Sequence, residues 1–157
     1  MPPTLLFDLT DIDLDHVAYD VAAIEAINPQ RGDMRQLDGV IWADEAGGRA
    51  VAVKQVKADE FWVPGHIPGR PLYPGVLMIE AAAQLSGFVT LKKLQEHFFL
   101  GFAGVDEVKF RAQVTPGDRL ILLAELVSVR RRRAVCRVQG LVGQTMVFEA
   151  VITGMPL

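Results

Sequence analysis

The sequence predicts an α+β fold in which a curved antiparallel sheet wraps around one long central helix. Two observations carry this prediction. A long apolar helical segment covers 75–95 in the middle of the chain, and alternating, strand-like stretches lie on both sides of it. The lengths of the later stretches suit neighbouring antiparallel strands. The chain has 157 residues, which fits one main domain.

The elements before the helix are short. Asp20 can cap a helical turn of apolar residues that Pro29 ends. Strand-like stretches follow at 39–44 and 49–56. They flank Glu45-Ala46-Gly47-Gly48, whose two glycines favour a hairpin turn.

The helix over 75–95 is apolar on nearly every face in its first half, which is typical of a buried helix. Lys92 and Lys93 mark its exit to solvent. A turn is expected at 114–118. Further strands are expected at 104–112, 120–129, 134–142 and 145–153.

Residues 1–20 form an acidic N-terminal extension to a main domain at 21–157. Five aspartates are spread along it, and we expect a solvated segment. Metal binding by these aspartates is the alternative, but the segment lacks the glycine and the terminal glutamate of a calcium loop.

Composition excludes several classes of protein. The net charge is −3 and the pI is near 5.6, so a role in coating nucleic acid is not expected. The single cysteine, Cys136, cannot form an internal disulfide and is expected to pack as a small apolar residue. No run of 18 apolar residues and no signal peptide is present, so we expect a cytoplasmic protein without a membrane span. No metal-ligand cluster, phosphate loop or nucleotide fingerprint is found, so no cofactor is expected.

The stretch 64–75 holds four prolines and three glycines, which indicates a rigid loop of specified shape. His66 lies in this loop, and histidine is the side chain best suited to accept a proton near neutral pH. The loop ends at Gly75, where the first N–H groups of the helix are free to meet a carbonyl oxygen that gains negative charge.

Glu80 lies in the middle of the apolar helical segment, with Gln84 four residues on and on the same face. Burial raises the pKa of a carboxyl group, as a general acid near neutral pH requires. The alternative is a glutamate that faces water or pairs with an arginine. His66, Glu80 and the Gly75 N–H together supply a base, an acid and an oxyanion donor. That set suits removal of a proton next to a carbonyl with loss of a β-hydroxyl.

The run from Gly65 to Gln84, GHIPGRPLYPGVLMIEAAAQ, resembles the signature of the 3-hydroxyacyl-[acyl-carrier-protein] dehydratases of fatty-acid synthesis. That signature reads G-H-F-P, two residues, P, two residues, P-G-V, then a glutamate and A-x-A-Q. The resemblance extends over roughly 21–153.

This resemblance implies a hotdog fold and a hydro-lyase that forms a trans-2-enoyl thioester from a substrate linked to acyl carrier protein or CoA. It implies that His66 takes the α-proton and that the Gly75 N–H polarises the thioester carbonyl. It also implies that Glu80 protonates the leaving hydroxyl or positions water toward it. Gln84 then orients Glu80, and the Leu72 carbonyl holds the His66 ring. The residues expected to contact substrate are Ile67, Val76 and Phe110.

The resemblance also implies a homodimer that shares two active sites, with the histidine from one subunit and the glutamate from the other. A trimer of such dimers is a further expectation. Family members often hold a cis peptide bond after the histidine. Relatives with isomerase activity carry aspartate where this chain has Glu80, which favours simple dehydration.

The chain departs from the pattern in two places. Ile67 replaces the usual phenylalanine. The family's L-P-H-R, aromatic and apolar run up to V-D-R reads N-P-Q-R-G-D-M-R-Q-L-D here, over 28–38. The bulky residues that normally gate the acyl tunnel are therefore missing.

Three alternatives remain open at this point. A thioesterase of the same fold would use Glu80 to activate water, and a non-catalytic module would only bind an acyl thioester or its carrier. The run Arg130 to Arg133 is expected to be a solvated hairpin, or else a docking site for an acidic acyl carrier protein.

Overall fold

The computed structural model describes residues 3–44, 46 and 48–157. Six strands form one antiparallel sheet in the order β1-β2-β4-β5-β6-β3. The helices are α1 (Val21–Glu25), the 3₁₀ turn η1 (Gly32–Met34) and the long α2 (Gly75–Leu94). The strands are β1 (Gly39–Asp44), β2 (Arg49–Gln55), β3 (Leu100–Phe110), β4 (Arg119–Arg130), β5 (Arg133–Val142) and β6 (Thr145–Pro156).

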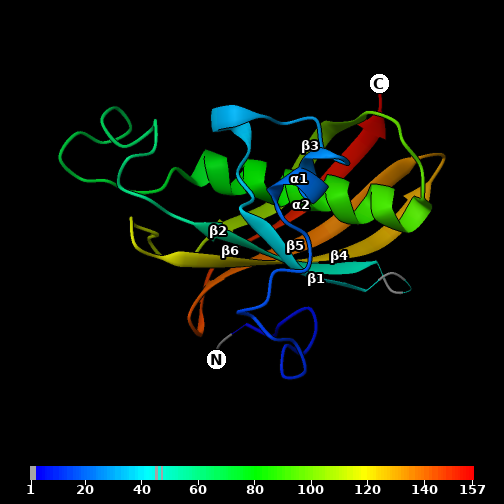
Figure 1. Cartoon of the computed structure of the whole chain (residues 1–157), viewed down its shortest axis with the longest axis horizontal. Helices are drawn as coiled ribbons and strands as arrows, with labels where there is room; N and C mark the ends of the chain where they lie inside the picture. Colours follow the sequence, from blue (N-terminus) through cyan, green and yellow to red (C-terminus); the bar gives the residue numbers. More distant parts are fainter. Residues whose placement is uncertain (1–2, 45, 47) are drawn as a thin grey trace.

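The helix α2 lies across one face of the curved sheet (Figure 1), and the predicted α+β hotdog fold is confirmed. Its side chains Ala81, Leu85 and Phe88 are fully buried. The helix ends at Gln95, whose φ of 54° is the left-handed conformation that commonly closes a helix. The start of α2 is less enclosed, because Val76 is 72% exposed.

Both faces of the sheet are packed. Along β4, Leu120 and Leu122 belong to the apolar cluster beneath α2, whereas Ile121 and Leu123 belong to a second cluster on the opposite face. This alternation is the two-residue period of a strand. A strand buried on both faces needs a second layer of chain on the side away from α2.

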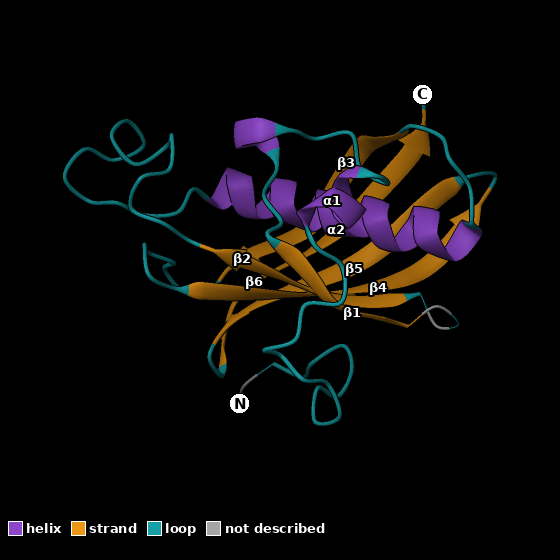
Figure 2. Cartoon of the chain, in the orientation of Figure 1, coloured by secondary structure: helices purple, strands orange, loops and turns teal. Residues whose placement is uncertain are grey.

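The N-terminal segment supplies that layer, on the side of the sheet away from α2 (Figure 2). Phe7 is 8% exposed and lies against the ring of Trp42, and the backbone N–H of Leu6 donates to Gln139. Further apolar contacts come from Leu9, Ile12 and Leu14. The expectation of a solvated extension is therefore wrong for the packed apolar residues of this segment, whereas Leu5, Val17 and the aspartates are exposed. Residues 1–2 lie outside the described part.

Two hairpins were expected from the sequence. The β4–β5 hairpin is confirmed: Arg130 pairs with Arg133, and Arg131 and Arg132 have φ values of 50° and 67°. Positive φ at both central residues is the turn that matches the twist of a two-residue hairpin. The turn between β1 and β2 is also where it was expected, but Glu45 and Gly47 lie outside the described residues.

The short helix α1 begins as expected, because the Asp20 side chain accepts a hydrogen bond from the N–H of Ala23. In the part of the chain that the structure describes, no helix is both long and apolar enough to cross a membrane.

Candidate active site

The proline- and glycine-rich loop leaves β2 and projects beyond the sheet before it returns to start α2 (Figure 1, teal to green). Within the loop, the carbonyl of Trp62 accepts hydrogen bonds from the N–H groups of Gly65 and His66, at 3.3 and 2.9 Å. The second half of the loop is held by the Tyr73 N–H, which donates to the carbonyl of Val114 at 2.8 Å. The loop is thus tied down on both sides of its tip.

His66 is exposed in the single chain, and its ring is oriented by one contact. Nδ1 lies 2.8 Å from the carbonyl oxygen of Leu72. A carbonyl oxygen can only accept, so Nδ1 carries the proton of the neutral ring. Nε2 is left with a free lone pair and can act as a base.

Gly75 is the first residue of α2, and its N–H has no carbonyl partner within the helix. A Cβ at this position would lie 2.8 Å from the ring of Phe110, so no side chain fits without displacing that ring. Gly75, Leu72, Val76 and Phe110 line one open hollow of about 470 Å³. Four of the residues expected at the site therefore meet there.

Glu80 lies one and a half turns further along α2 and is half-buried. Its carboxylate accepts a hydrogen bond of 2.8 Å from Nε2 of Gln84. Glu80 lines a cavity of about 150 Å³ between α2 and the strands β3, β5 and β6. Other lining residues include Gln30, Ser86, Thr90, Phe102, Cys136 and Ile152.

Gln84 is 2% exposed, and its carboxamide is held on both sides. Nε2 also donates to the carbonyl of Met34 at 2.6 Å, and Oε1 accepts from the N–H of Gln36 at 2.8 Å. The Asn28 side chain donates to the backbone carbonyl of Gln84 at 2.9 Å. The segment that departs from the family signature thus provides the bonds that orient Gln84.

Sequence reasoning did not find this role of Asn28, Met34 and Gln36. The three residues lie in an aperiodic stretch around η1, and two of the contacts are made by backbone atoms, which leave no trace in residue type. The sequence offers no signal for this role, because the burial of Asn28, which is 4% exposed, appears only in the structure.

One chain does not bring the expected acid and oxyanion donor into a common space. The hollow at Gly75 and the cavity at Glu80 have no lining residue in common. Five residues along a helix rotate by about 140°, so the two positions lie on different faces of α2. Val76 and Phe110, which line the hollow, are 72% and 52% exposed, and Ile67 in the preceding loop is 37% exposed.

Other expectations can be compared with the structure. The described residues contain no cis peptide bond, so the one expected after His66 is absent. They also contain no group of three or more His, Cys, Asp and Glu side chains placed to hold a metal ion.

Cys136 is buried, and burial raises the pKa of its thiol to about 11, as expected for a packed and unreactive side chain. The Arg130 to Arg133 side chains are exposed at the hairpin, where Arg132 pairs with Glu96 at 3.6 Å.

Comparison with known proteins places the chain in a family. The model of the FabA-like domain matches residues 28–151. The chain is 39% identical over 134 residues to the 3-hydroxyacyl-[acyl-carrier-protein] dehydratase FabZ of Listeria monocytogenes serotype 4b, covering 85% of this chain and 92% of that protein. It is 37% identical over 136 residues to the FabZ of a Hydrogenobaculum species, covering 85% and 91%. The chain belongs to the FabA-like family, and its curated relatives are FabZ-type dehydratases.

Solved structures agree on the fold. The dehydratase heterocomplex ApeI:P from Xenorhabdus doucetiae matches with a TM-score of 0.71 at 16% identity, over 85% of this chain and 90% of that chain. Cj0977, a sigma28-regulated virulence protein from Campylobacter jejuni, matches with a TM-score of 0.67 at 18% identity, over 93% and 96%.

Proposed function

We propose that this protein removes water from 3-hydroxyacyl thioesters carried on acyl carrier protein, and so acts as a hydro-lyase of fatty-acid biosynthesis. The observation that carries the proposal is the pairing of Glu80 with buried Gln84 at the mouth of a cavity. Membership of the FabA-like family and the FabZ-type relatives support the same reaction.

The steps follow from the geometry of the side chains. Nε2 of His66 takes the proton from C2 of the substrate, because Nδ1 is committed to the Leu72 carbonyl. The Gly75 N–H stabilises the charge that develops on the thioester oxygen. Glu80 donates a proton to the C3 hydroxyl, the C3–O bond breaks, and the double bond forms between C2 and C3 as water leaves.

A homodimer is part of this proposal. His66 lies in an exposed loop, and the hollow at Gly75 is separate from the cavity at Glu80 within one chain. The exposed apolar side chains Ile67, Val76 and Phe110 would be covered by a partner subunit. In the dimer, each site combines His66 and Gly75 of one subunit with Glu80 of the other. A trimer of dimers and a cytoplasmic location stay predictions.

The first experiment follows the absorbance of the enoyl-thioester band with short and long 2-enoyl thioesters, because dehydration is reversible. Wild type is expected to hydrate the double bond, and His66→Ala and Glu80→Gln to lose about 10²- to 10⁴-fold in turnover. His16→Ala is the matched control, since His16 is exposed in the N-terminal segment. Near-normal turnover by His66→Ala would contradict the assignment. Release of free thiol without loss of the double bond would indicate a thioesterase, and saturable binding without turnover a binding module.

A subunit-mixing experiment tests the shared site. When His66→Ala and Glu80→Gln chains are unfolded together and refolded, half of the dimers are mixed, and each mixed dimer holds one intact site of two. About a quarter of wild-type activity is therefore expected from this symmetry. A site built within one chain would show no recovery.

A further inference from the structure

Gln36 carries more bonds than its contact with Gln84 requires. It is 1% exposed, and its backbone N–H donates to Oε1 of Gln84. Its side-chain amide donates to the carbonyl of Asp33 at 2.9 Å, and its side-chain oxygen accepts a bond of 2.7 Å from the Tyr73 hydroxyl. The Gln36 side chain therefore fixes the backbone that holds Gln84.

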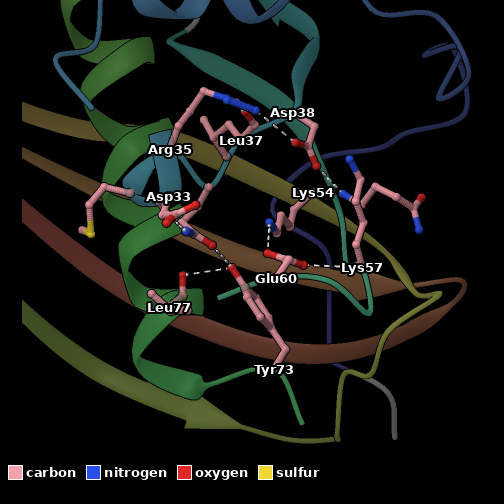
Figure 3. Close-up of polar contacts among 12 residues, drawn as sticks. Asp33, Arg35, Leu37, Asp38, Lys54, Lys57, Glu60, Tyr73 and Leu77 are labelled. Carbon is pink, nitrogen blue, oxygen red and sulfur yellow. Dashed lines mark hydrogen bonds and ion pairs between the residues drawn. The ribbon is translucent and has the colours of Figure 1, made fainter. Parts of the chain in front are cut away.

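Tyr73 is buried at 1% exposure and lies between the first turn of α2 and the ion pair of Lys54 and Glu60 (Figure 3). Its ring packs against Trp62 at 5.6 Å between centroids. Burial, followed by the charge of Glu60, raises the pKa of the Tyr73 hydroxyl. The hydroxyl therefore stays protonated and remains a hydrogen-bond donor.

The Tyr73 hydroxyl depends on Gln36. Its other acceptor, the carbonyl of Leu77, is at the longer distance of 3.3 Å. Without Gln36 the buried hydroxyl would have only this longer bond, which favours the pair with Gln36.

Tyr73 also stands next to the residue that orients the base. The carbonyl of Leu72 holds the His66 ring, and the backbone N–H of Tyr73 is fixed by Val114. Tyr73 is therefore adjacent to Leu72, which orients His66, and is bonded to Gln36, which holds Gln84.

We propose that Tyr73 and Gln36 form a positioning pair that holds Gln84, and through it Glu80, in the orientation needed to protonate the leaving hydroxyl. This inference rests on the proposed dehydration. Tyr73 also lines the hollow at Gly75, but only 1% of it is exposed and its hydroxyl bonds Gln36, so the pair acts through Gln84. The altered segment 28–38 then has a second role, because it replaces apolar side chains with the polar group that Tyr73 requires.

The chain has two tyrosines, which allows a matched test. Tyr73→Phe removes only the hydroxyl and is expected to lower kcat by about 10- to 100-fold, by analogy with outer-shell residues that orient metal ligands, with little change in KM. The pH dependence of kcat is expected to shift, because Glu80 is less well held. Tyr19→Phe is the control: Tyr19 packs against Phe88 and is expected to leave both kinetic parameters unchanged.

Gln36→Met keeps the length of the side chain and the backbone N–H but removes the acceptor. It is expected to match Tyr73→Phe, and the double variant is expected to be no slower than either single one, because the two residues act as a unit. Independent, multiplying losses would overturn the pairing.

A readout without turnover separates this inference from the proposed function. The side-chain NH₂ signals of Gln84, assigned by their loss in Gln84→Met, are expected to shift in Tyr73→Phe but not in Tyr19→Phe. If the variants show this pattern but wild type shows no dehydration, the proposed function fails and the positioning stands. If Tyr73→Phe keeps wild-type kcat, pH profile and Gln84 signals, and only its melting temperature falls, the positioning role is wrong.

Discussion

Gly75 and Phe110 occupy touching positions at the start of α2, with space for a hydrogen but not for a methyl group between them. A Cβ on Gly75 would lie 2.8 Å from two ring carbons of Phe110. The helix N-terminus can approach β3 this closely only with glycine, and the free Gly75 N–H faces substrate in the proposed mechanism.

Gly75→Ala is therefore expected to displace Phe110 or the first turn of α2 and to lower kcat by about 10²-fold or more, the loss typical of one oxyanion donor. KM and kcat are measured together, with circular dichroism to verify the fold. Adding Phe110→Leu to Gly75→Ala makes room for the methyl group and is expected to recover part of the activity. If Gly75→Ala is fully active, the close approach of Gly75 to Phe110 is not needed to place the N–H.

Phe7 anchors the N-terminal segment to the face of the sheet opposite α2. Its ring lies 5.8 Å from that of Trp42, and the Arg49 guanidinium lies 5.4 Å from its centroid. Phe7→Ala is expected to lower the free energy of unfolding by about 3 kcal/mol, as for other buried phenylalanines, and to leave kcat unchanged. Denaturant titration measures the free energy of unfolding, and the enoyl-thioester assay measures kcat. Leu5→Ala is the control, because Leu5 is 36% exposed. Equal, small losses in both variants would show that the segment contributes little.

Cys136 gives the fold a defined pH dependence. Burial raises the pKa of its thiol from 9.0 to about 11. Below pH 9 the thiol is protonated in both states; between pH 9 and 11 the unfolded chain loses this proton first, so stability falls as pH rises. In Cys136→Ala the free energy of unfolding is expected to fall by about 2–3 kcal/mol less between pH 9 and 11, since each pKa unit is worth about 1.4 kcal/mol. Parallel denaturant titrations at pH 9 and 11 measure it. An equal fall in the free energy of unfolding between pH 9 and 11 in both proteins would contradict the expectation.

The β4–β5 hairpin offers a test of carrier docking. Arg131 and Arg133 are exposed, whereas Arg132 is engaged by Glu96 and by the Phe98 ring at 4.3 Å. Charge reversal at Arg131 and Arg133 is expected to lower kcat/KM for substrate on acyl carrier protein, most clearly at low salt, and to spare the CoA-linked substrate. Steady-state assays with both substrates decide this. Equal loss on both substrates, or loss on neither, would argue against docking at this hairpin.

The sequence by itself determined the elements and the chemistry that it could support. The helix over 75–95 and the strands around it were predicted within a few residues, because hydrophobic periodicity is a local property of the chain. The rigid loop, His66, Gly75 and Glu80 were identified by residue type and spacing, which a single element fixes. Helix geometry predicted that Gln84 shares a face with Glu80, and the family resemblance implied that it orients Glu80.

Only the tertiary structure decided how distant segments meet. Leu6 and Gln139 are 133 residues apart, and Gln36 and Gln84 are 48 apart, so no local pattern encodes either contact. Ile12 and Leu14 alternate with aspartates in the N-terminal extension. The need to cover the second face of the sheet nevertheless became visible only when β4 was found buried on both sides. The separation of Gly75 from Glu80 around α2 is likewise a property of packed helix faces. Contacts of this kind form because removing apolar surface from water is favourable for any two complementary surfaces, whatever their distance along the chain.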